Sequence, residues 1–270
     1  MAIKTANFKQ AKISYSDSGK GRTIVLLHGF LGAHNIWDKY TKALSKKYRV
    51  LAINLPGHAN SPCIGYTHSM EMLAQSVKAV CDKAGVRRYI IAGHSMGGYV
   101  ALAFAELFPN NVSGLCLIHT TAYADSEEKI SDRNRLIDLV KNGKTTLVTN
   151  LITNLFTEEK KERIGLVINH AQSIADNTPN QGIINSLEGM KTRKSRELIL
   201  KTVEYPVFFV FGKLDGAITE DAMFSQIGLC KYPFVVMLEN EGHMGFIEEP
   251  KQVLTQLQAF VSKCFRKKFN

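Results

Sequence analysis

The chain has 270 residues, of which 45% are hydrophobic and 21% charged, an ordinary balance for a globular protein with a sizeable core. Its net charge of +10 comes mostly from scattered basic residues in the first 119, with no nucleic-acid motif, so we expect no nucleic-acid partner. No apolar run is long enough to span a membrane, and the first residues lack a signal-peptide layout. Five widely spaced cysteines exclude a zinc cluster or a disulfide framework. We therefore expect a soluble, cytoplasmic protein with reduced thiols.

The predicted elements alternate between strands and helices. Residues 9–17 alternate in polarity and predict an antiparallel edge strand. Residues 23–27 are a continuous apolar run ending at His28, typical of a strand buried on both faces. Similar runs predict strands at 50–53, 89–92, 114–118, 207–211 and 234–238. Amphipathic segments predict helices at 35–47, 69–84, 97–108 and 251–264. This order predicts an α/β fold whose mostly parallel sheet has helices on both faces.

Residues 120–204 interrupt that alternation, because they contain no convincing strand. Ser126 and Thr157 each precede acidic residues and then apolar positions at helical spacing, which indicates a capped helix start. Thr178 is expected to cap a third helix, with Pro179 in its first turn. We therefore predict a helical lid at 120–204, inserted into a core of residues 1–119 and 205–270.

The strongest chemical signal is the sequence Gly93-His-Ser-Met-Gly97, which lies between a predicted strand and a predicted helix. The flanking glycines permit the sharp turn that lifts the hydroxyl of Ser95 above the sheet edge, at the start of the helix. A serine in this setting is a candidate nucleophile, provided that a base removes its proton.

His243 is the favoured base, because it follows the last predicted strand in a loop with two glycines, and catalytic groups gather at the carboxyl ends of parallel strands. His119 also ends a strand and is the main rival. His28 ends a strand too, but the Gly29-Phe30 that follows it fits a different role, the supply of a backbone N–H to an oxyanion. His94 adjoins Ser95 in sequence, so its side chain is expected to point away from the serine.

The base needs an acid to fix its tautomer. Asp215, just after the strand at 207–211, is favoured; Asp125 is the alternative and Asp221 a weaker one. The backbone N–H groups of Met96 and Phe30 are the candidate oxyanion donors. No metal-ligand cluster is visible, and these parts need no metal or organic cofactor.

Four parts of the chain form one pattern: His28-Gly29, Gly93-His-Ser-Met-Gly-Gly98, Asp215 and Gly242-His243. With this pattern the chain resembles the α/β-hydrolase superfamily over nearly its whole length. The resemblance implies an eight-stranded, mostly parallel sheet flanked by helices, with a helical lid over Ser95. It also implies the chain order serine, acid, histidine, which favours Asp215 over Asp125 and His243 over His119. The chain departs from the family pattern after the fourth strand, where it has Asn54 and Ala59 in place of aspartate and glycine.

The resulting hypothesis is a serine hydrolase that cleaves a small carboxylic-ester-like substrate through an acyl-enzyme, similar to carboxylesterases and enol-lactonases. One alternative is a ligand-binding protein on the same fold with an idle or slow site, since fold does not determine function. Another is a hydrolase of thioesters or of substrates bound to an acyl carrier. Four leucines of the lid are candidates for an acyl pocket or for plain packing: Leu136, Leu139, Leu151 and Leu155.

Overall fold

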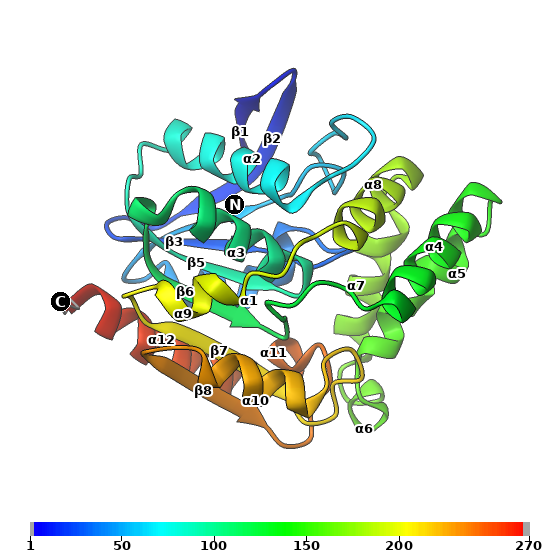
Figure 1. Cartoon of the computed structure of the whole chain (residues 1–270). Coiled ribbons are helices and arrows are strands. Elements are labelled where there is room, and N and C mark those ends of the chain that lie inside the picture. Colours follow the sequence, from blue (N-terminus) through cyan, green and yellow to red (C-terminus); the bar gives the residue numbers. More distant parts are fainter. Residues whose placement is uncertain (1–2, 267–270) are drawn as a thin grey trace.

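The computed structural model describes residues 3–266, built around one eight-stranded sheet (Figure 1). The strands lie in the order β1-β2-β4-β3-β5-β6-β7-β8. β2 pairs antiparallel with β1 and β4, and all other pairs are parallel. The strands are β1 (Ile3–Phe8), β2 (Ala11–Ser18), β3 (Thr23–Leu27), β4 (Arg49–Ile53), β5 (Tyr89–His94), β6 (Val112–Ile118), β7 (Val207–Gly212) and β8 (Pro233–Leu238).

The six predicted apolar strands are confirmed, with ends that differ by at most two residues. The predicted edge strand at 9–17 is wrong in extent. Lys9, at φ 51°, begins a turn that joins β1 to β2, so the edge is a hairpin. β1 buries only Ala6, so its sequence lacks the apolar run that marks the central strands.

Helices cover both faces of the sheet (Figure 1). α2 and α3 pack together on one face, and α1 and α12 lie on the other. All four match predicted helices, although the segment predicted at 35–47 begins with a 3-10 turn, η1 (His34–Trp37). The sequence did not predict α10 or the short α11. The core helices are α1 (Asp38–Leu44), α2 (Met70–Lys83), α3 (Met96–Leu107), α10 (Glu220–Gly228), α11 (Gly245–Glu248) and α12 (Pro250–Arg266).

Between β6 and β7 the chain forms helices and no strand, as the pattern at 120–204 predicts. In Figure 1 the green elements of this helical insertion form a layer beside the carboxyl edge of the sheet, and α9 returns to pack on α3. The insertion comprises α4 (Glu127–Lys141), α5 (Thr145–Thr149), η3 (Asn150–Leu155), α6 (Glu158–Lys161), α7 (Gly165–Asp176), α8 (Asn180–Lys191) and α9 (Glu197–Thr202). A short 3-10 turn, η2 (Pro109–Asn111), lies outside the insertion and precedes β6.

Of the three predicted helix caps, the structure confirms one. Ser126 caps α4 as expected, its hydroxyl accepting from the Lys129 N–H. Thr157 is the residue before α6, as expected, but its hydroxyl donates to Glu248 and makes no capping hydrogen bond to the helix. The cap predicted at Thr178 is wrong, because α8 begins only after Pro179 and the Thr178 hydroxyl donates to the Ile174 carbonyl of the preceding helix.

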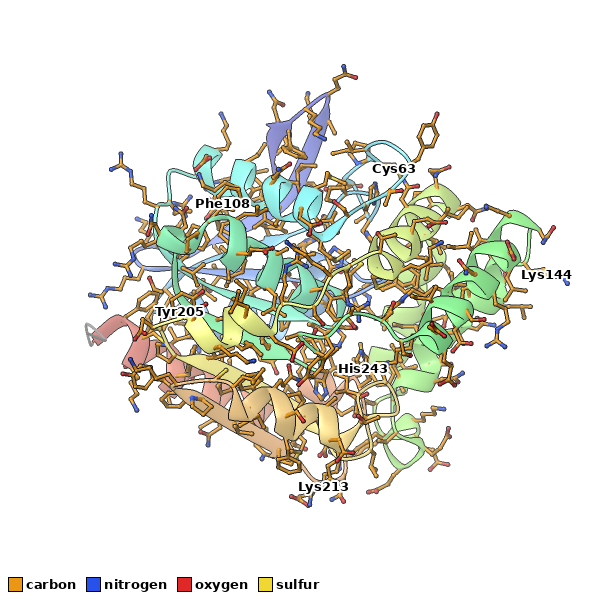
Figure 2. The ribbon with its side chains drawn as sticks, viewed as in Figure 1. Cys63, Phe108, Lys144, Tyr205, Lys213 and His243 are labelled. Atoms are coloured by element: carbon orange, nitrogen blue, oxygen red, sulfur yellow. The ribbon has the colours of Figure 1, made fainter. Side chains whose placement is uncertain are left out.

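The core lies on both sides of the central strands. β3 and β5 are buried along their entire length, which explains their continuous apolar sequences. Cys116 on β6 is a buried small side chain, as predicted, and all five cysteines are free. Figure 2 shows His243 between the sheet and the insertion, whereas Lys144 lies at the insertion's outer tip. None of the helices described is both long and apolar enough to cross a membrane.

Candidate active site

Ser95 occupies a strained turn between β5 and α3. Its backbone is at φ 50°, ψ −117°, a region that side chains other than glycine rarely adopt and that costs roughly 1–3 kcal/mol. The turn is possible only because two neighbours are glycines. A Cβ at Gly93 would lie 2.1 Å from the Gly97 oxygen, and one at Gly97 would lie 2.5 Å from the Leu27 oxygen. The turn holds Ser95 at the helix start, as predicted.

The structure brings the three residues favoured from the sequence together in one hydrogen-bonded chain. The Ser95 Oγ lies 2.9 Å from Nε2 of His243. On the other side of the ring, Nδ1 lies 2.9 and 3.0 Å from the two carboxylate oxygens of Asp215. Since a carboxylate accepts, Nδ1 carries the proton, and the lone pair of Nε2 faces the serine hydroxyl.

Asp215 is placed to stay ionised. Its side chain is fully buried, and its Oδ1 accepts from the Ala217 N–H at 2.9 Å. Burial alone would raise its pKa, but His243 and His119 outweigh that effect and hold the pKa below its usual range. An ionised carboxylate at this position fixes the tautomer of His243 and would stabilise its protonated form.

The rival histidines do not contact Ser95 through a hydrogen bond. His119 lies on the other side of Asp215, with Nδ1 at 3.4 Å from Oδ2, and burial lowers its pKa. His28 donates from Nδ1 to the Gly29 oxygen and accepts the Leu55 N–H at Nε2, so it braces the neighbouring loop. These two histidines are structural neighbours of the site.

His94 contacts the backbone of His243. Its Nε2 donates to the backbone oxygen of His243 at 3.0 Å, and burial holds its pKa well below the ordinary value. The sequence placed His94 beside Ser95 but gave no sign of this contact, since the two partners are 149 residues apart.

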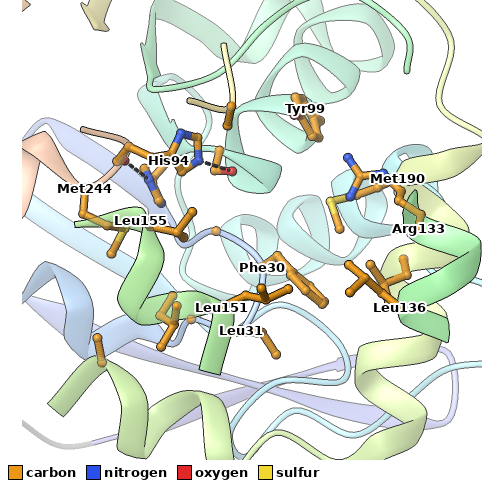
Figure 3. Close-up of a pocket in the computed structure, with 18 of the residues that line it drawn as sticks. Phe30, Leu31, His94, Tyr99, Arg133, Leu136, Leu151, Leu155, Met190 and Met244 are labelled. Carbon is orange, nitrogen blue, oxygen red and sulfur yellow. Dashed lines mark hydrogen bonds between the residues drawn. The ribbon is translucent and has the colours of Figure 1, made fainter. Parts of the chain in front are cut away.

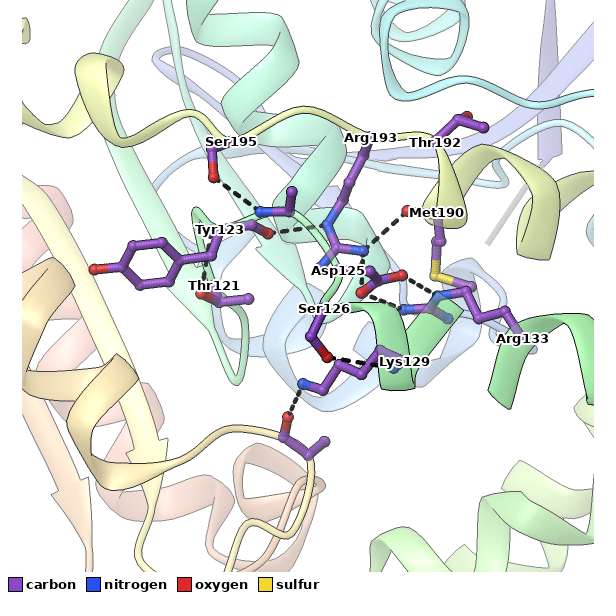
Figure 4. Close-up of polar contacts among 12 residues, drawn as sticks. Thr121, Tyr123, Asp125, Ser126, Lys129, Arg133, Met190, Thr192, Arg193 and Ser195 are labelled. Atoms are coloured by element: carbon purple, nitrogen blue, oxygen red, sulfur yellow. Dashed lines mark hydrogen bonds and ion pairs between the residues drawn. The ribbon is translucent and has the colours of Figure 1, made fainter. Parts of the chain in front are cut away.

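The alternative acid, Asp125, is engaged elsewhere (Figure 4). Its fully buried carboxylate binds the guanidinium groups of Arg133 and Arg193. Although burial raises its pKa, these two arginines hold the pKa below the usual range. Asp221, the weaker candidate, lies in the first turn of α10. Neither aspartate makes a hydrogen bond to His243 in the part of the chain that the structure describes.

A buried glutamate that sequence reasoning missed anchors the loop of His243. Oε2 of Glu248 accepts the Gly242 N–H at 3.0 Å. Its Oε1 accepts the Thr157 N–H at 2.6 Å and the Thr157 hydroxyl at 2.9 Å. Glu248 therefore ties the residue before His243 to the helical insertion. The only signal in the sequence was an acidic residue in an otherwise apolar turn after the histidine.

Two unpaired backbone groups flank the serine. Within residues 3–266, neither the Phe30 N–H nor the Met96 N–H has a hydrogen-bond partner. Met96 is the first residue of α3, where N–H groups have no partner inside the helix. Phe30 lines the same cavity as Ser95. These are the two donors that the sequence suggested for an oxyanion.

Ser95 and His243 open into a cavity of about 260 Å³ between the core and the insertion (Figure 3). Its walls are mainly apolar. Leu136, Leu151 and Leu155 line it, as the sequence allowed, but Leu139 does not. Three charged residues also line it: Lys129, Asp132 and Arg133. No cluster of three or more histidine, cysteine or carboxylate side chains suited to a metal ion is found in the described chain.

Comparison with known proteins places the chain in a family. The family model described as alpha/beta hydrolase fold matches residues 22–250. The chain belongs to the α/β hydrolase family. This α/β hydrolase is 25% identical to a Nitrosomonas europaea protein named pimeloyl-[acyl-carrier protein] methyl ester esterase, over 92% of this chain and 99% of the relative.

A second relative is longer than this α/β hydrolase. The dihydrolipoyllysine-residue acetyltransferase component of the acetoin cleaving system from Pseudomonas putida is 29% identical over 91% of this chain, but the chain spans only 65% of that relative's length. A solved esterase from Thermogutta terrifontis, with bound malate, superposes with a TM-score of 0.91 at 24% identity, covering 98% of this chain and 99% of that one. At that identity, the superposition concerns the fold.

Proposed function

We propose that the protein is a serine hydrolase of small carboxylic esters and that it works through an acyl-enzyme. The observation that carries this proposal is the unbroken hydrogen-bonded chain from Ser95 through His243 to a buried Asp215. The ester class is supported by the names of the two esterases described above, one similar in sequence and one in fold.

The mechanism follows from the positions of the protons. Nε2 of His243 takes the proton of the Ser95 hydroxyl as Oγ attacks the carbonyl carbon of the ester. The negative charge on the carbonyl oxygen is held by the N–H groups of Phe30 and Met96, which act as preorganised donors. The protonated His243 then gives its proton to the departing alcohol oxygen while the ester C–O bond breaks.

Water completes the cycle. His243 removes a proton from a water molecule, which attacks the acyl carbon on Ser95. Collapse of the second oxyanion returns the proton to Oγ and releases the carboxylic acid. Asp215 keeps its charge throughout and stabilises the protonated imidazole. These steps need no metal ion and no organic cofactor.

We also propose that the segment 120–204 acts as a lid that selects the substrate. The cavity has the core on one side, with Ser95 and Phe30, and the insertion on the other, with Leu136 and Leu151. A wall of this kind excludes water and limits the length of the acyl group. Replacing Leu151 by Ala should shift the preferred acyl length while leaving turnover of an acetate ester within roughly tenfold.

We also propose that the protein works in the cytoplasm. All five thiols are free, and burial raises the pKa of Cys81, Cys230 and Cys264 to about 12, so they are poor nucleophiles and poor redox centres. Such thiols suit a reducing, cytoplasmic setting.

The test is a panel of p-nitrophenyl esters of increasing acyl length, given to the wild-type protein and to Ser95→Ala. We expect turnover by the wild type and a loss of about 10⁴-fold or more in the variant. A variant that kept more than a tenth of the wild-type activity would remove Ser95 from its role. A wild type that bound these esters without hydrolysing them would instead favour a ligand-binding protein.

A further inference from the structure

The cavity has a basic group among its apolar walls. Arg133, on α4, lines the same cavity as Ser95, and its side chain is only 17% exposed. In Figure 3, Arg133 and Met190 lie across the cavity from Met244 and His94. Met244 directly follows His243 in the sequence, and His94 directly precedes Ser95. A guanidinium facing an apolar chamber is unusual unless something balances its charge.

The charge of Arg133 is balanced only in part. Its partner, Asp125, also binds Arg193, whose Nη1 lies 2.6 Å from Oδ1. Two guanidinium groups thus share a single carboxylate, which leaves one positive charge in excess. The other acid of the cavity, Asp132, is exposed and pairs with Arg135 at 2.8 Å, outside the cavity.

The two arginines of this cluster differ in their access to the cavity. Arg193 does not line the cavity and is 2% exposed: its Nε and Nη1 donate to the backbone oxygens of Tyr123 and Met190, and its guanidinium lies 3.9 Å from the ring centre of Tyr99. Arg133 uses Nε and Nη2 on Asp125, and within the described chain its Nη1 has no hydrogen-bond partner. Figure 4 shows both arginines converging on Asp125.

A second cation lies beside Arg133. Lys129, one turn earlier on α4, also lines the cavity, and its Nζ donates to the Ala217 oxygen at 2.7 Å. Ala217 lies two residues after Asp215, so this contact ties the cationic face of α4 to the loop of the acid. An ammonium has three N–H groups, and this contact uses one of them.

We propose that Arg133, aided by Lys129, binds a carboxylate carried by the substrate at the end remote from the ester bond. A guanidinium with one edge fixed by Asp125 is already oriented, so it loses little freedom when it binds an anion. Its place inside the cavity favours a small soluble molecule, a monoester of a dicarboxylic acid, over a charged macromolecule at the outer surface. This inference rests on the proposed ester hydrolysis.

A simpler role for Arg133 is to fasten α4 to the loop of Asp125. That role would affect all substrates alike, whereas the proposed role affects only anionic ones. The test therefore compares monomethyl esters of dicarboxylic acids with neutral methyl esters of equal chain length. The variants are Arg133→Gln, Arg133→Lys and, as a control on the same helix, Lys141→Gln, which removes one positive charge from an exposed residue in the last turn of α4.

We expect the wild type to prefer the anionic monoesters. Arg133→Gln should lower their kcat/KM by about ten- to hundredfold, mainly through KM, with neutral esters changed by less than about threefold. Arg133→Lys should recover part of the loss, and Lys141→Gln should match the wild type. Equal losses for anionic and neutral esters, or no preference in the wild type, would overturn the inference while leaving the hydrolase proposal intact.

Binding of the dicarboxylate products measures the same contact without turnover. The Ser95→Ala protein, which keeps Arg133, should bind glutarate or adipate, and adding Arg133→Gln should weaken that binding by at least about tenfold. Unchanged binding would count against Arg133 even if ester hydrolysis itself failed.

Discussion

Glu248 offers the sharpest structural test of how His243, the proposed base, is held in place. Replacing it by Gln keeps the size of the side chain but removes the charge and turns one acceptor oxygen into a donor. In the native protein the two oxygens accept three hydrogen bonds, from the Gly242 N–H and from the N–H and hydroxyl of Thr157. An amide nitrogen cannot accept, so at least one of these donors loses its partner.

The size of the effect follows from burial. Glu248 is 2% exposed, so water does not replace the lost contact. Hydrogen bonds to charged groups contribute roughly 1.5–3 kcal/mol, and an unsatisfied buried donor costs a similar amount. We therefore expect Glu248→Gln to lower the free energy of unfolding by about 2–4 kcal/mol. Because Gly242 precedes His243, a shift near 1 Å in the base should also lower kcat by about 10- to 100-fold.

The assay pairs urea unfolding with steady-state kinetics on one ester. The control is Glu249→Gln, the next residue, whose side chain is 32% exposed and whose charge lies 4.0 Å from Lys160. A partly exposed pair of this kind contributes less than about 1 kcal/mol, so the control should resemble the wild type in both measurements. If Glu248→Gln behaved like this control, the loop of His243 would not depend on the glutamate and the reasoning would be refuted.

Three further outcomes are expected. Asp215→Asn should lower kcat by roughly 10²–10⁴-fold, whereas Asp125→Asn should lower stability but keep kcat within about tenfold; the reverse order in kinetics would reassign the acid. Ala59→Gly should raise Tm by about 2–4 °C, because exposed Ala59 has φ 47°, and an unchanged or lower Tm would contradict the strain argument. Burial lowers the pKa of His58 from 6.5 to about 4. The unfolded chain therefore binds more protons below pH 6.5, and the stability this neutral histidine confers is lost as pH falls toward 4. His58→Gln should reduce that acid-induced loss by about 3 kcal/mol, and a pH dependence identical to the wild type would contradict it.

The sequence predicted the sheet well because its central strands are buried on both faces and therefore form unbroken apolar runs. Ser95 was predictable because its turn needs glycines at 93 and 97, and each of these lies only two residues from it in the sequence. The edge hairpin was harder, since β1 buries a single residue and shows no apolar run.

The residues that were missed act through contacts between distant parts of the chain. Glu248 reaches Thr157 across 91 residues, and His94 reaches the His243 carbonyl across 149. Arg133 belongs to an ordinary amphipathic helix by sequence, and only the path of α4 across the cavity brings it near the candidate catalytic site. Spacing along the chain carries no signal for such contacts.

The central claim, that Ser95 is the activated nucleophile, is tested most directly by covalent labelling. A fluorophosphonate reacts with a serine hydroxyl that an adjacent base activates, losing fluoride and forming a stable Ser–O–P bond. Mass spectrometry of the intact protein and of its peptides should find one adduct, on Ser95, which disappears in Ser95→Ala and forms at least about 100-fold more slowly in Asp215→Asn. An adduct on another residue, or an unlabelled protein that still hydrolyses esters, would contradict the account.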